Sequence, residues 1–147
     1  MKLRYTATSN AITGYAESTI AKAEKADCVV RAIASASGMT YDKAHSYVAN
    51  KFNRKPRKGT FGFAPGMNAM CNTKEKLNRK GVKTITDLTN GKSRMTVGAF
   101  ANLYDRGTYI IRVTGHAFTI KDGVVIGNTQ DAVMVRRIVK NAWKIGR

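Results

Sequence analysis

The sequence predicts an α+β protein, because helix-like segments fill its first half and strand-like segments its last third. Residues 28–37 are small or apolar on nearly every side, which is typical of a buried helix. Residues 108–113 and 116–121 are rich in β-branched and aromatic side chains, which favour strands. The expected architecture is therefore a set of N-terminal helices packed on a C-terminal antiparallel sheet.

A helix is predicted to begin at Cys28. Residues 19–26 are rich in Ala, Lys and Glu and favour a helical segment that leads up to it. Asp27 is a good N-cap residue, and Gly38 supplies a C-terminal stop. Since so little of this helix is polar, we expect it inside the protein.

A second helix is predicted after Thr40, which is another favourable N-cap residue. The apolar side chains of residues 41–48 recur at the spacing of one helical face, so this helix is expected to pack against the preceding one. The basic, glycine-bearing segment 53–66 is predicted to be a loop. Residues 67–77 are predicted to form a short helix.

The remainder of the chain is predicted to be mainly β. Residues 81–85 resemble a short strand, and Thr96 is the expected N-cap of a short helix that ends near Gly107. Strands are then expected at residues 108–113, 116–121, 124–128 and 136–145.

The composition is that of a globular protein, with 43% apolar residues and two prolines among 147 residues. We expect one domain over residues 1–147, in which residues 1–20 could form an irregular segment. No stretch approaches the roughly 18 apolar residues that cross a bilayer, and no apolar run follows the basic start of the chain. We therefore expect a cytoplasmic protein with no membrane partner, in which Cys28 and Cys71 are free thiols.

The turn at residues 121–123 predicts which side chains face each other in a hairpin. A three-residue Lys-Asp-Gly loop places His116 directly opposite Asn128, with facing Cβ atoms about 5 Å apart. The Asn128 amide could then orient the imidazole and leave its other nitrogen free. Asp131 is the alternative orienting group, and a two-residue loop would turn Asn128 away. The alternative for His116 is a purely structural role, as a histidine of the core with its hydrogen bonds satisfied.

Cys28 is the candidate nucleophile. A thiol in the first turn of a helix has a lowered pKa, because free backbone N–H groups and the helix dipole favour the thiolate. A nearby imidazolium from His116 would lower the pKa further, and the backbone N–H of Cys28 could help to bind an oxyanion. These residues predict acyl transfer through a thioester. The alternative is that Cys28, like Cys71, is a small buried apolar residue.

Five stretches of the sequence resemble a known protein family. They are DCVVRAIA at 27–34, GMTYD at 38–42, GTYI at 107–110, GHAF at 115–118 and KDGV at 121–124. They resemble the small papain-like cysteine peptidase domains encoded by tailed bacteriophages, over about residues 25–145.

The resemblance implies a papain-like fold, in which a central helix begins at the nucleophile and packs on an antiparallel sheet. It implies that Cys28 is the nucleophile, that His116 is general base and acid, and that Asn128 or Asp131 orients the ring. It also implies a protein or peptide substrate in the cytoplasm of a bacterial host.

The sequence departs from this family at one position. Papain-like enzymes commonly carry a glutamine about six residues before the cysteine, where it donates into the oxyanion hole, and this chain has Lys22 there. Lys22, Ser18 and Asn10 are the candidate replacements. Losing one such donor lowers the rate on the order of a hundredfold or more.

The chain is strongly basic, with 26 Lys and Arg against 9 Asp and Glu and a net charge of +17. This charge predicts attraction to nucleic acid or to an acidic host protein, and the plain alternative is a solvated surface that keeps the protein soluble. The candidate residues for polyanion binding are Lys51, Arg54, Lys55, Arg57, Lys58, Arg136, Arg137 and Lys140. The sequence contains no phosphate-binding glycine loop and no zinc-spaced Cys/His cluster, so no metal or cofactor is predicted.

Overall fold

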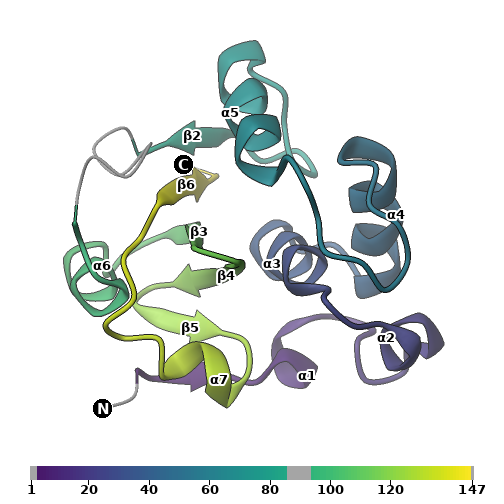
Figure 1. Cartoon of the computed structure of the whole chain (residues 1–147), viewed down its shortest axis with the longest axis horizontal. Helices are drawn as coiled ribbons and strands as arrows, with labels where there is room; N and C mark the ends of the chain where they lie inside the picture. The colour runs from purple at the N-terminus through teal and green to yellow at the C-terminus, as the bar shows by residue number, and fades with distance from the viewer. Residues whose placement is uncertain (1–2, 86–93, 147) are drawn as a thin grey trace.

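A mixed six-stranded sheet lies at the centre of the structure, a computed structural model that describes residues 3–85 and 94–146 (Figure 1). The strands are β1 (Tyr5–Thr6), β2 (Val82–Thr84), β3 (Thr108–Val113), β4 (His116–Lys121), β5 (Val124–Ile126) and β6 (Asn141–Ile145). Their order in the sheet is β1-β5-β4-β3-β6-β2. β1 runs parallel to β5, whereas the other neighbours are antiparallel. The α+β class is confirmed, but the expectation of a wholly antiparallel sheet is wrong at this edge.

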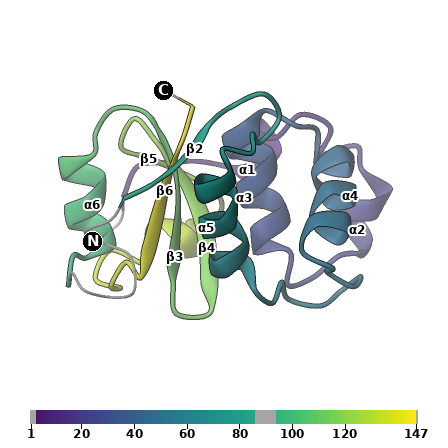
Figure 2. The same ribbon diagram turned by 90° about the horizontal axis from the view of Figure 1, so that it is seen from above.

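Helices cover both faces of the sheet. They are α1 (Thr8–Ala11), α2 (Thr19–Ala23), α3 (Cys28–Ser37), α4 (Tyr41–Lys51), α5 (Phe63–Thr73), α6 (Val97–Leu103) and α7 (Thr129–Ala132). Figure 2 shows α6 on one face, α3 and α5 on the other, and α2 with α4 in an outer layer beyond α3. None of the helices within the described part of the chain has the length and apolar character needed to cross a bilayer.

Alternating side chains of the strands divide the core into two clusters. On β3, Ile110 points into the cluster on the α3 side, whereas Ile111 points into the cluster that contains Phe100 of α6. Trp143 of β6 is fully buried in the first cluster, and its indole Nε1 donates to Asn68 of α5 at 2.9 Å. The sheet is therefore buried on both faces, and α3 is its central cover.

Helix α3 begins at Cys28 and ends at Ser37, as predicted. Its small buried residues allow close packing on β4, where the Thr119 hydroxyl donates to the Ala32 carbonyl at 2.9 Å. Gly38 ends the helix in the left-handed region, with φ 83°. Asp27 occupies the N-cap position, but its side chain makes no capping hydrogen bond and is bound by other side chains described below.

Side-chain caps fix the starts of two other helices as predicted. The Thr40 hydroxyl accepts from the Lys43 N–H at 3.2 Å, and the Thr96 hydroxyl accepts from the Ala99 N–H at 3.1 Å. Helix α5 spans Phe63–Thr73, so the expected limits of 67 and 77 are both wrong by four residues. The proline in its first turn is tolerated there, because it lacks only an N–H that the helix does not use.

Three further segments of the chain differ from the sequence prediction. Residues 1–20, expected to be irregular, contribute β1 and α1. The strand expected over 124–128 ends at Ile126, since residues from Thr129 form α7. The strand expected over 136–145 begins only at Asn141, where the chain comes to lie beside β3.

Candidate active site

Cys28 is the first residue of α3, at the end of the helix that carries free backbone N–H groups. Its side chain is half-buried, and both cysteines are free thiols, as predicted. Burial opposes ionisation of Cys28, but its pKa is nevertheless lowered by interaction with the His116 side chain, by the Ala117 backbone N–H and by nearby positive charge. The thiol at the helix start therefore ionises more readily than an ordinary cysteine.

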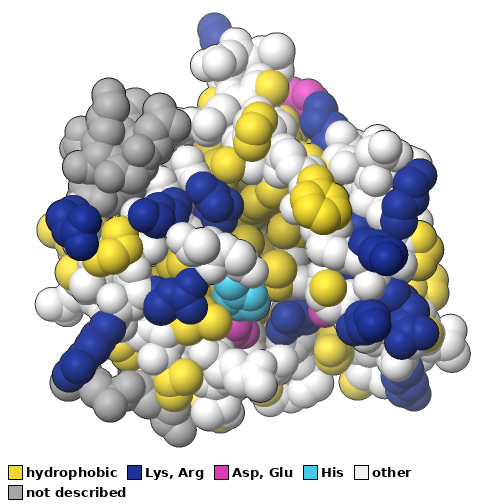
Figure 3. All heavy atoms as spheres, viewed as in Figure 1, with side chains coloured by type: hydrophobic (Ala, Val, Ile, Leu, Met, Phe, Trp, Pro, Cys, Tyr) yellow, Lys and Arg dark blue, Asp and Glu magenta, His cyan; other side chains and the backbone are white. Residues whose placement is uncertain are grey.

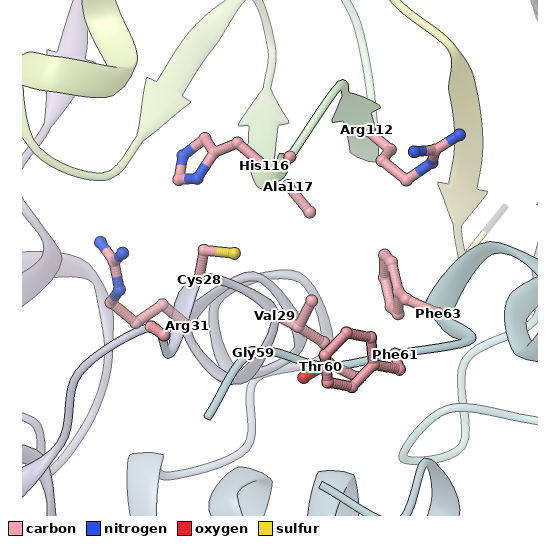
Figure 4. A pocket seen from close by; sticks show the side chains of 12 residues that line it. Cys28, Val29, Arg31, Gly59, Thr60, Phe61, Phe63, Arg112, His116 and Ala117 are labelled. Atoms are coloured by element: carbon pink, nitrogen blue, oxygen red, sulfur yellow. The ribbon is translucent and has the colours of Figure 1, made fainter. Parts of the chain in front are cut away.

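His116 is the first residue of β4 and follows a tight turn from β3. Val113 pairs with His116 across this turn, and Gly115 adopts a φ of 77°, which glycine tolerates without strain. Because β4 packs on α3, the hairpin brings the imidazole to the start of the helix. Figure 4 shows His116 and Cys28 on opposite sides of one opening.

A buried carboxylate holds the far side of the imidazole. The Oδ1 atom of Asp131 lies 2.6 Å from Nε2 of His116, and Asp131 is 3% exposed. Its Oδ2 atom accepts from the Asn128 backbone N–H at 2.8 Å. Since Nε2 is engaged by the carboxylate, Nδ1 is the ring nitrogen left for the sulfur.

The pKa values within this set are displaced in complementary directions. Burial lowers the pKa of His116, but the hydrogen bond to Asp131 and the interaction with Cys28 raise it to about 9. Burial raises the pKa of Asp131, but the hydrogen bonds from His116 and from Asn128 lower it below its ordinary value. Together the three groups favour a thiolate beside an imidazolium, with a carboxylate behind it.

The hairpin register predicted from the sequence is wrong. Lys121 pairs with Val124, so the loop has two residues and not three. Asp122 and Gly123 both have positive φ, of 50° and 77°, which is the turn that Asp-Gly favours in a two-residue hairpin. Extended along the strands, this register places Asn128 and His116 on opposite faces of the sheet.

Asn128 therefore does not contact the imidazole. Of the two candidates for the group that orients the His116 ring, the structure places Asp131 there. Asn128 is the N-cap residue of α7, and its Oδ1 accepts from the Thr8 hydroxyl at 3.2 Å. The spacing Asn-x-x-Asp before a short helix is a capping signal, and it could have indicated that Asn128 and Asp131 flank a helix start.

The expected oxyanion donors from the N-terminal segment do not reach the site. Ser18 is buried as the N-cap of α2, where its hydroxyl accepts from the Ala21 N–H and donates to Asp42. Lys22 and Asn10 are exposed, and neither lines the pocket beside Cys28. Arg31, which the sequence analysis did not single out, lines this pocket because it lies one helical turn after Cys28 on the same face.

A pocket of about 340 Å³ opens beside Cys28 and His116. Its wall comes from three places: the start of α3, the β3–β4 hairpin, and the loop before α5 that includes Gly59 and Phe61. Figure 3 shows apolar side chains in this hollowed face, next to a histidine and surrounded by Lys and Arg side chains. A pocket with apolar walls and few polar groups is typical of a binding site for a small part of a ligand.

The residues predicted to bind polyanions do not form one surface. Arg54 is 5% exposed, and its guanidinium donates to both carboxylate oxygens of Glu24 at 2.9 and 3.1 Å, so its assignment to a binding surface is wrong. Lys51 pairs with Glu75. Of the other candidates, Lys55, Arg57, Lys58, Arg136 and Arg137 are exposed, whereas Lys140 is half-buried.

Within the described residues, no group of His, Cys, Asp and Glu side chains is arranged to hold a metal ion. Comparison with known proteins returned no matching family model, no matching curated protein and no matching solved structure.

Proposed function

We propose that this chain is a papain-like cysteine hydrolase, a peptidase or a related acyl-transfer enzyme, encoded by a bacteriophage and acting on a protein or peptide in the host cytoplasm. One observation carries the proposal: Cys28 begins a helix beside His116, whose Nε2 atom is held by the buried Asp131 at 2.6 Å. A nucleophile, a base and an orienting group in this relation are what thiol-dependent acyl transfer requires, which supports the proposal.

In the proposed reaction the Cys28 thiolate attacks the substrate carbonyl carbon, and the carbonyl electrons move to its oxygen. The Cys28 backbone N–H, at the helix start, stabilises that oxyanion. As the intermediate collapses, the C–N bond breaks and the His116 imidazolium gives its proton to the leaving amine. Water then attacks the thioester while neutral His116 takes a proton from it, which releases the acid and restores the ion pair.

Selective alkylation tests this proposal. Iodoacetamide at neutral pH is expected to modify Cys28 at least about tenfold faster than Cys71, because the pKa of Cys28 is lowered and a pocket opens beside its sulfur. Cys71 is an internal control in the same sample, since it is also half-buried and its sulfur accepts from the Thr84 hydroxyl at 3.1 Å. The preference should fall in His116→Ala. Equal labelling of the two cysteines would contradict a thiol site.

A second candidate function is binding of nucleic acid or an acidic protein through the basic surface. The observation that favours it is the run Lys55, Arg57 and Lys58, which is exposed on the loop at the pocket wall. Retention on heparin or single-stranded DNA should weaken steeply between low and moderate salt and should survive Cys28→Ala. Replacement of the three residues by Gln should weaken the dependence of binding on salt concentration. A lack of retention at low salt would contradict this function.

A further inference from the structure

The pocket beside Cys28 is lined by cationic side chains without acidic ones. Arg31 and Arg112 line it, and no Asp or Glu does so among the residues that the structure describes. Since the two arginines differ in their partners, they also differ in the charge that each presents to a ligand.

Arg31 already has a carboxylate partner within the protein. Its Nε atom donates to Oδ1 of Asp27 at 3.2 Å, and the other oxygen of this carboxylate accepts from the buried Tyr41 hydroxyl at 2.7 Å. A carboxylate held by two donors is fixed in place, so Arg31 carries a compensated charge.

Arg112 has a neutral partner instead. Its Nε atom donates to the Asn141 amide oxygen at 2.8 Å, and Asn141 is 3% exposed. This contact orients the guanidinium through a neutral oxygen, and within residues 3–85 and 94–146 its two terminal nitrogens form no hydrogen bond. No carboxylate in the described part of the chain forms an ion pair with Arg112.

The sheet register explains why Arg112 reaches the pocket. Arg112 pairs with Ala117 of β4 and with Asn141 of β6, so its side chain stands on the face that α3 covers. Figure 4 shows it above Phe63, on the side of the pocket away from Arg31, with the Cys28 sulfur turned towards that side.

The wall below Arg112 combines apolar and polar groups. Phe63 and Val29 are buried and line the pocket, whereas Phe61 is 85% exposed at the same pocket. The Thr60 hydroxyl oxygen is buried without a hydrogen-bond partner among the described residues. A short methylene chain that ends in a carboxylate matches this wall, because its carbons contact the phenyl rings and its oxygens reach the guanidinium.

We propose that Arg112 selects substrates that carry a glutamate or aspartate side chain on the acyl side of the scissile bond. The inference rests on the proposed thiol chemistry: His116 protonates the leaving amine, so the amine lies beside the imidazole. The acyl part then extends away from the ring, towards Arg112 and Phe63 (Figure 4).

Paired peptidyl vinyl sulfones test this inference without the need for turnover. The two reagents of each pair differ only by Glu or Gln at one position, and modification of Cys28 is followed by mass spectrometry. At one position, the Glu reagent is expected to react at least about tenfold faster, because an Arg–carboxylate contact replaces an Arg–amide contact. Arg112→Gln should bring this ratio close to one. Arg112→Lys should leave an intermediate ratio, because Lys keeps the positive charge but lacks the paired N–H donors of a guanidinium.

Arg106→Gln is the matched control, because it removes the same charge from an exposed position outside the pocket and should leave the ratio unchanged. Equal rates with Glu and Gln at every position in the unmodified protein, with Cys28 still selectively labelled by iodoacetamide, would overturn the inference and leave the thiol site standing. Failure of all reagents to distinguish Cys28 from Cys71 would overturn both.

Discussion

Asp131 and Asn128 illustrate how much depends on one residue of hairpin register. The carboxylate contacts Nε2 of His116, whereas the amide lies at the start of α7 with Thr8 as its partner. A carboxylate stabilises the imidazolium through a full negative charge, whereas an amide can offer it only a dipole. The two side chains therefore predict different consequences when each is removed.

Asp131→Asn is expected to slow iodoacetamide labelling of Cys28 at neutral pH by roughly tenfold, because it removes the charge that stabilises the imidazolium and hence the thiolate. Asn128→Ala should slow the rate less, by about twofold or below, since its side chain binds Thr8 and caps the start of α7 but does not contact the imidazole. Alkylation kinetics followed by mass spectrometry measure both. An equal loss of rate in the two variants would contradict the assignment of Asp131 as the orienting group.

The protonation state of His116 gives a second prediction for single residues. Its pKa is raised to about 9, so the ring is charged at neutral pH and loses its proton as the pH rises through about 9. Thiol-dependent hydrolysis should therefore decline above that pH, whereas alkylation of Cys28, which needs only the thiolate, should not. NMR titration of the ring nitrogens is the direct measurement. Cys28→Ala should lower the pKa of His116, because the interaction with the sulfur helps to raise it.

At the scale of elements, the junction between β5 and α7 positions the carboxylate. Gly127 lies between these elements, and a Cβ atom at this residue would come within 2.1 Å of Oδ2 and 3.3 Å of Cβ of Asp131. The glycine is required there because the carboxylate approaches the backbone closely, and its φ is not positive.

Gly127→Ala is therefore expected to displace the Asp131 carboxylate, although Cys28, His116 and Asp131 themselves are not substituted. Alkylation of Cys28 should fall about as much as in Asp131→Asn. Gly81→Ala is the control, because a Cβ there would meet no atom within 4 Å. Circular dichroism should show that both variants remain folded. Unchanged alkylation in Gly127→Ala would contradict the close packing of the carboxylate on this junction.

The elements of this protein could be predicted from local signals where one signal dominates. The α3 helix is bounded by Cys28 and Gly38, and β3 and β4 are bounded by turns, so all three were predicted with their observed limits. The elements that were missed depend on distant partners: β1 forms only because Tyr5 and Thr6 pair with Val125 and Ile126. Two residues cannot signal a strand by periodicity.

The candidate site was predictable in the same partial way. The pairing of Cys28 with His116 followed from their residue types and positions, but the third residue depended on a turn that can have two or three residues. The role of Arg54 was also hidden, since one basic residue among several neighbours gives no local sign that Glu24, thirty residues earlier, is its partner.

In a chain with a net charge of +17, the buried Glu24 carboxylate links two distant segments of the molecule. Glu24 accepts hydrogen bonds from the Arg54 guanidinium and from the Arg57 backbone N–H, and thereby ties the loop of residues 53–62 to the end of α2. This loop supplies Gly59, Thr60 and Phe61 to the pocket wall. Overall stability and the shape of the pocket are therefore linked through one ion pair.

Arg54→Met is expected to lower the free energy of unfolding by roughly 3–5 kcal/mol, because it leaves the Glu24 carboxylate, 3% exposed, without its cation. Lys51→Met removes a cation from the exposed pair with Glu75 and should cost less than about 1 kcal/mol. Urea unfolding followed by tryptophan fluorescence measures both, since Trp143 is the single tryptophan and is fully buried. Equal costs for the two variants would contradict a special role for the buried pair.

The same pair contributes to the response of the molecule to acid. Hydrogen bonds from Arg54, opposed by burial and supported by His45 and the Arg57 N–H, lower the pKa of Glu24 from 4.5 to about 2. A group whose pKa is lowered on folding contributes stability above its unfolded value, and this contribution is lost as the pH falls through the folded value. The protein should therefore lose this contribution between about pH 4.5 and pH 2. In Arg54→Met the pKa of Glu24 rises, so acid unfolding should begin at a higher pH than in Lys51→Met. Coincident acid transitions of the two variants would show that the lowered pKa of Glu24 does not depend on Arg54.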